Sequence, residues 1–231
     1  MVAMKKSGWI VLWSGVVVVA VAGVFGTGCS SGLKYKVDDA ALDNVSAGEK
    51  KGIFDAKNES EVANSELRTA QSGLDALERD RDVAKNEKKQ ADLEVEKAAT
   101  EEESAVASRD ENRHNKAKQG KEVASQGVKV AEAKLEWLDQ KEDALKAQQK
   151  AAEAHQKAAE AKAEFEKAKL AQQKNIKPDS DFSVGNYESQ WKDKNSDWQS
   201  AKKDAESEDK KANEREQKWK EIVAQHAKMK G

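Results

Sequence analysis

The stretch from Ala56 to Lys174 contains no proline and repeats apolar side chains every seven residues. With Leu67 at heptad position a, every position d as far as residue 105 is Leu or Ala, whereas position a mixes apolar and charged residues. This pattern predicts a coiled-coil seam. Because each methylene that alanine lacks forfeits about 0.8 kcal/mol of burial, two such helices would hold each other weakly, and we expect a third helix or a partner chain. The d positions are Ala70, Leu77, Ala84, Ala91, Ala98 and Ala105.

The heptad pattern fades between residues 108 and 122, where the only apolar side chain is Ala117 and several residues are weak helix formers. One interpretation is the tip of an antiparallel hairpin that folds residues 56–107 back on residues 123–174. The other is an uninterrupted solvated helix, which the unbroken count of sevens from Leu67 to Val123 favours. We expect the hairpin, since a single helix over 56–174 would extend about 180 Å at 1.5 Å per residue.

A linker predicted at residues 175–186 ends the hairpin, because Pro178 cannot continue a helix. An amphipathic helix is predicted for residues 187–231. The expected fold class is therefore all-α, an elongated coiled-coil helical hairpin with a third packed C-terminal helix.

Tryptophans recur on the predicted third helix at multiples of seven residues. We expect these indoles, and one on the hairpin, to pack the helices together by laying large side chains across alanine stripes. A tryptophan row would also suit a sugar or aromatic ligand, but the helical spacing favours packing. The residues are Trp137, Trp191, Trp198 and Trp219.

The composition favours long helices over a globular core. Only 37% of the 231 residues are hydrophobic, 36% are charged, and there is a single proline. Such a chain has too few large apolar side chains for an ordinary core, and its periodicity favours coiled coil over the disorder that polar composition also permits. The net charge is −2 with the two signs finely mixed. No basic block marks a nucleic-acid surface, so we expect no nucleic-acid partner.

Residues 1–28 have the parts of a secretory signal peptide, with a basic start, an apolar run from Trp9 to Phe25, and small residues up to Gly28. The only cysteine, Cys29, follows directly. The sequence GTGC at this point resembles the lipobox of bacterial lipoproteins. That family usually has Leu or another aliphatic residue where this chain has Gly26.

The resemblance to lipoproteins implies that the chain is cut between Gly28 and Cys29 and that Cys29 carries a covalent lipid. It also implies export to the outer membrane, since Ser30 rather than Asp follows the cysteine. Residues 29–55 would then be the acylated N-terminus and a tether with a short helix. More than one acyl chain is expected, because a single chain binds membranes only marginally. The alternative is an uncleaved helix over Trp9–Phe25 that anchors the chain in the inner membrane.

The sequence predicts no catalytic residue, metal site or cofactor. Its histidines, His114, His155 and His226, have no ligand spacing that stands out in so acidic a chain, and no phosphate-binding loop or nucleophile motif is present. We therefore expect a periplasmic structural spacer or scaffold that is held to the membrane by its lipid and joins a protein partner or a second copy through coiled-coil contacts. The alternative is a module that binds cell-wall material or a client protein between the hairpin and the third helix.

Overall fold

The computed structural model describes residues 32–178 and 180–230, and every regular element in these ranges is a helix. A short 3-10 helix η1 (Asp39–Leu42) precedes three long α-helices, α1 (Lys51–Ala107), α2 (Glu111–Gln173) and α3 (Val184–Lys230). The predicted all-α fold, a helical hairpin with a third packed helix, is confirmed.

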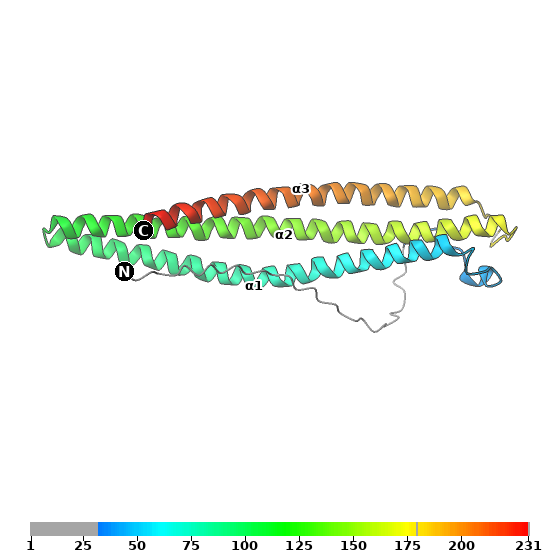
Figure 1. The fold of residues 1–231 in the computed structure, drawn as a ribbon, viewed down its shortest axis with the longest axis horizontal. Coiled ribbons are helices and arrows are strands. Elements are labelled where there is room, and N and C mark those ends of the chain that lie inside the picture. The colour runs from blue at the N-terminus through cyan, green and yellow to red at the C-terminus, as the bar shows by residue number, and fades with distance from the viewer. Residues whose placement is uncertain (1–31, 179, 231) are drawn as a thin grey trace, which may run out of the picture. The chain divides into compact units, whose positions relative to one another are not determined.

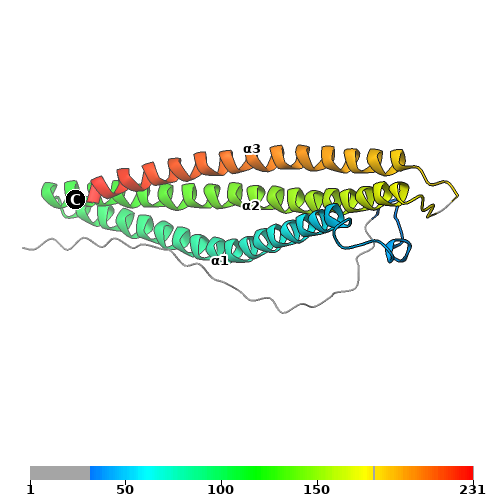
Figure 2. The same cartoon turned by 45° about the vertical axis from the view of Figure 1, so that its right-hand side comes forward.

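Helix α2 is the central element of the described chain, with α1 along one side and α3 along the other (Figures 1 and 2). Both neighbours run antiparallel to it. Within residues 32–178 and 180–230, no Cα atom of α1 lies within 8 Å of a Cα atom of α3. The three helices therefore form an open layer rather than a closed bundle, and α2 supplies two packing faces.

The α1–α2 face is the predicted alanine seam. Buried residues recur every seven positions on both helices, and Leu77 and Leu138 are the bulkiest of them, at 2% and 1% exposure. Small knobs of this kind let two helices lie close together while contributing little burial each. On α1 the buried set is Ala56, Ala63, Ala70, Leu77, Ala84 and Ala105; on α2 it is Ala117, Ala124, Ala131, Leu138, Ala152 and Ala159.

Oppositely charged side chains flank this seam in the same register. Lys162 Nζ lies 2.9 Å from a Glu59 oxygen, His155 Nδ1 lies 3.0 Å from Glu66, and Lys134 Nζ lies 2.6 Å from Glu87. Each step of seven residues along α1, or a multiple of it, is matched by an equal step backwards along α2. Since sliding one helix by a turn would break every pair together, the pairs fix the register more than they stabilise the fold.

Helix α1 ends and α2 begins within a three-residue turn, Ser108–Asp110. Arg109 takes the left-handed conformation with φ 58°, and the Asp110 side chain accepts a hydrogen bond from Arg113 N at 3.0 Å, which caps α2. The hairpin tip is therefore shorter than the predicted 108–122. The rest of that polar interval is helical because Ala117 is buried against α1 and Lys121 pairs with Glu102 at 2.7 Å; these contacts outweigh weak helix propensity.

Helix α2 ends at Gln173, five residues before the proline that marked the predicted linker. Asn175 has φ 55°, Ile176 N donates to Ala171 O, and Asn175 N donates to Gln172 O, which together form a Schellman motif. Pro178 follows in the loop, and α3 begins at Val184, three residues before the predicted start.

Replacing Leu138 with Ala is expected to lower the free energy of unfolding by about 2–5 kcal/mol, since a fully buried leucine leaves a cavity among its neighbours. Denaturant unfolding followed by circular dichroism measures this loss. Val106→Ala, at a side chain that is 56% exposed, is the control and should change stability by less than about 0.5 kcal/mol. Equal effects of the two substitutions would contradict the seam.

Candidate functional site

Two places in the described chain bring side chains from distant segments together. The first lies near the N-terminal end of the described residues and holds the extended segment Lys34–Val37. Four side chains of α2 and α3 grip its backbone, and we call them the tether clamp. They are Glu164, Lys167, Tyr187 and Gln190.

Gln190 of α3 forms hydrogen bonds with the first two residues of the segment, Lys34 and Tyr35. Its Oε1 accepts from Lys34 N at 2.8 Å and from Tyr35 N at 3.0 Å, and its Nε2 donates to Tyr35 O at 3.0 Å. A single amide therefore satisfies three backbone groups, as a neighbouring strand would. The Tyr187 hydroxyl donates to Lys36 O at 3.2 Å and extends the grip by one residue.

Helix α2 contacts the last residue of the segment, Val37, through two charged side chains. Glu164 Oε2 accepts from Val37 N at 2.7 Å, and Lys167 Nζ lies 3.4 Å from Val37 O. Lys167 is 7% exposed and pairs with Glu164 at 2.8 Å and with Asp39 of η1 at 2.7 Å. A buried cation requires such compensation, and here the cation ties η1 to α2.

The ionisation of this network follows from its contacts. Burial by itself lowers the pKa of Lys167, but hydrogen bonds to Asp39 and Glu164 outweigh it, so the pKa lies above the ordinary 10.5. The hydrogen bond from Lys167 lowers the pKa of Asp39 below its ordinary 3.8, although partial burial opposes the shift. Both groups are therefore charged across the neutral range.

A compact apolar cluster lies beside the clamp and joins residues from the N-terminal segment, η1 and all three long helices. Tyr35 and Phe182 contact the Tyr187 ring at centroid distances of 5.7 and 5.9 Å. This end of the layer has the large side chains that the alanine seam lacks. The buried members are Val37, Leu42, Val45, Ile53, Ala168, Leu170, Ala171 and Tyr187.

The predicted packing tryptophans lie between α2 and α3, where each stacks on an aromatic ring. Trp191 stacks on Phe165 at 5.5 Å, Trp198 on His155 at 4.2 Å, and Trp219 on Trp137 at 4.9 Å, all within 8° of parallel. The expected partners were alanines, and in these three stacks the rings meet rings instead. Alanine does meet α2 midway, where Ala205 and Ala212 occupy the same heptad row of α3.

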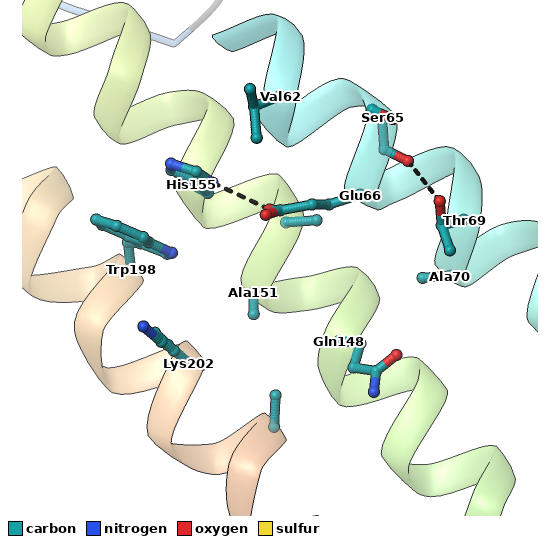
Figure 3. Close-up of a pocket in the computed structure, with 12 residues that line it drawn as sticks. Val62, Ser65, Glu66, Thr69, Ala70, Gln148, Ala151, His155, Trp198 and Lys202 are labelled. Atoms are coloured by element: carbon teal, nitrogen blue, oxygen red, sulfur yellow. Dashed lines mark hydrogen bonds and ion pairs between the residues drawn. The ribbon is translucent and has the colours of Figure 1, made fainter. Parts of the chain in front are cut away.

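The second place is a groove of about 500 Å³ that crosses all three helices around the Trp198–His155 stack (Figure 3). Val62, Glu66 and Thr69 line it from α1, while Lys202 lines it from α3. We call it the His155 groove. Sequence reasoning missed it because its walls come from three separate segments. A signal was nevertheless present, since His155 and Glu66 lie on matched heptad rows.

The His155 groove presents stacking and charged groups. Glu66 is the hydrogen-bond partner of His155, and no hydroxyl or thiol group within the described residues bonds to this imidazole. The Thr69 hydroxyl is already engaged with the Ser65 carbonyl at 2.9 Å.

No family model, curated protein or solved structure matches this chain. Inference about function therefore rests on the residues themselves.

The predicted signal peptide (residues 1–28), the alternative helix Trp9–Phe25, and the cleavage and lipidation residues Gly28 and Cys29 all lie outside the described residues. Of the histidines, His114 lies near the start of α2, His155 is in the groove, and His226 packs near Gly127. Within residues 32–178 and 180–230, no three His, Cys, Asp or Glu side chains gather as a metal-binding group. In those same ranges, none of the helices combines the length and the hydropathy required for a membrane span.

Replacing Lys167 with Met is expected to lower the free energy of unfolding by about 1–3 kcal/mol, because the Val37 carbonyl and Glu164 lose a buried partner. The wild type should lose stability as pH rises through the raised pKa of Lys167, above 10.5, since the unfolded chain releases this proton first. Stability should also fall in acid, as pH drops through the lowered pKa of Asp39.

Denaturant unfolding at pH 2, 7 and 11 measures these changes. The Lys167→Met variant should lack the part of the alkaline loss that this lysine causes, and Lys218→Met, on the exposed side of α3, is the matched control. A Lys167→Met variant with wild-type stability at pH 7 would contradict the role given to the clamp.

Proposed function

We propose that this protein is a lipid-anchored envelope lipoprotein whose helices act as a periplasmic structural spacer or scaffold. The tether clamp is the single observation that carries the proposal. It ties the residues just after Cys29 to one end of α2 and α3, so that the chain enters the helical layer through a fixed point.

The position of this entry point makes an attachment at Cys29 directional. Three residues of chain lead from Cys29 to Gly32, a link that spans at most about 11 Å. The clamp then holds the chain near the end of α2, whereas the Ser108–Asp110 turn lies at the start of the same helix. With 63 residues, α2 is about 95 Å long at 1.5 Å per residue. An anchor at the clamp end would therefore carry the turn well away from the bilayer surface.

The surfaces of the helices suit a spacer or adaptor. Mixed charges cover them, and several ion pairs, such as Lys85–Asp82 and Lys192–Glu188, join well-exposed side chains, which contribute little to stability but keep the surface solvated. Coiled-coil surfaces of this kind recognise partner helices through charge pattern.

A second candidate is a binding module, and the His155 groove favours it. The groove offers Trp198 for stacking and a Lys202–Glu66–Gln148 rim for hydrogen bonds, which is the mixture that sugars or peptides require. Titration with peptidoglycan fragments should then shift tryptophan emission in the wild type and in Trp219→Phe, but not in Trp198→Phe. No shift in any of the three would argue against this candidate.

Replacing Cys29 with Ala tests the anchor. A lipoprotein should lose its acyl label and move from the membrane fraction to the soluble fraction, while Ser31→Ala, two residues away, should keep both properties. Fractionation after metabolic labelling with a fatty acid measures the outcome. Membrane association that survives Cys29→Ala, with no acyl label on the parent, would contradict the proposal and favour an uncleaved N-terminal helix in the inner membrane.

A further inference from the structure

Helix α1 carries a second regular strip of residues, separate from its seam with α2. Its positions lie three or four residues apart: Val62, Ser65, Thr69, Ser72, Ala76, Arg79, Val83, Asn86, Gln90 and Leu93. Arg79 is the only charged residue at these positions, in a chain of which 36% is charged. Such 3–4 spacing is that of a coiled-coil seam, but no helix in the described residues covers it.

Exposed aliphatic side chains mark this strip as a contact surface. Val62 and Val83 are each 54% exposed, and Leu93 is 53% exposed. Scattered exposed residues need no explanation, but these three share one face of one helix. The neighbouring residues, Thr69 and Ala76, are small enough to let another helix approach closely.

The charges that border the strip select a partner. On the edge away from α2 the chain reads Glu61, Arg68, Asp75, Asp82 and Lys89 at seven-residue intervals. When this row is laid antiparallel on a copy of itself around position 75, Arg68 meets Asp82 and Glu61 meets Lys89. By two-fold symmetry each pair occurs twice. The charge pattern is thus self-complementary.

The charges at the centre of this arrangement also find opposite charges. Asp75 would face its own copy across the axis, but Arg79 lies one turn along the strip and reaches the same point from both helices. The existing ion pair of Asp82 would compete little with the new one, because Asp82 pairs with Lys85 at 3.3 Å in an exposed position. The opposite edge is acidic, and Glu66 and Glu87 on it are already paired with His155 and Lys134 of α2.

A parallel arrangement on the same strip fails on charge. Residues five apart would then meet across the interface, as at g and e positions of a parallel coiled coil. Glu61 would face Glu66, Asp75 would face Asp80, and Asp82 would face Glu87. These like-charged pairs disfavour the parallel dimer and leave the antiparallel one.

We propose that two copies of this chain pair through α1, antiparallel, with the two-fold axis at Asp75, next to Ala76. The two tether clamps then lie at opposite ends of the paired helices. Helix α1 has 57 residues, about 85 Å at 1.5 Å per residue. Where each copy is acylated, a consequence that rests on the proposed function, the pair joins two lipid surfaces and holds them apart.

Disulfide trapping tests the pairing directly. In the full chain in detergent, with Cys29→Ser so that one thiol remains, Ala76→Cys should form a disulfide-linked dimer in high yield under mild oxidation. Gln71→Cys, on the edge of α1 away from the strip, is the matched control and should stay mostly monomeric. Equal yields at the two positions, or none at Ala76→Cys in a chain that keeps its helical circular dichroism, would overturn the proposal.

Charge reversal tests the register without added thiols. Arg68→Glu creates two repulsive pairs and should raise the dimer Kd about tenfold or more in sedimentation equilibrium. Asp82→Arg added to it should restore the wild-type Kd, and Glu78→Lys, outside the strip, should leave it unchanged. Failure of the double variant to recover, or a monomeric wild type at high micromolar concentration, would overturn the pairing. Neither result depends on a lipid, so the anchoring proposal stands or falls separately with Cys29→Ala.

Discussion

The packing of one central helix against two neighbours is the constraint on which the whole layer depends. Helix α2 can serve both because alanine recurs on its two faces, and away from the ring stacks a methyl group lets a second backbone come close without a large side chain in the way. The cost is that each contact buries little. Stability must therefore accumulate over many heptads, which explains why the helices are long and why none of them forms an independent core.

Other interactions supply what alanine cannot, and they do so in separate places. Charged pairs beside the α1–α2 seam fix the register, stacked rings between α2 and α3 add bulk, and the clamp end has a cluster of large side chains. Gly73 makes room for a neighbouring side chain in the same way. A Cβ there would lie 2.9 Å from Leu145 Cδ2, so the absence of a side chain admits the leucine. The two ends of the layer consequently differ. The apolar cluster and the tether clamp lie at one end, and only the short turn between α1 and α2 lies at the other.

Much of the fold could be predicted from the sequence, because heptads depend on local spacing alone. Ala70 through Ala105 revealed the seam, and the tryptophan row revealed the third helix. The predicted hairpin tip was too long because it relied on the low helix propensity of Asn112 and Gly120. The tertiary contacts made by Ala117 and Lys121 outweigh that propensity.

The clamp escaped sequence reasoning for a different reason. Glu164, Lys167 and Gln190 look like any polar residue on a helix, and only the folded chain brings them onto the backbone of Lys34–Val37. Residues 34–37, within the segment expected to be a tether, are thus held by side chains of α2 and α3. The stacking partners of the tryptophans were missed similarly, since Phe165 and His155 face α3 only once the antiparallel register is known.

Distance from the bilayer tests the central claim most directly. A fluorophore placed at Lys177→Cys, near the clamp, and in a second sample at Glu111→Cys, beside the hairpin turn, would report energy transfer to acceptor lipids in membranes that hold the acylated protein at a density too low for two copies to pair. A spacer anchored at Cys29 predicts strong transfer from position 177 and almost none from position 111. Equal transfer from both positions, as from helices lying flat on the bilayer, would contradict it.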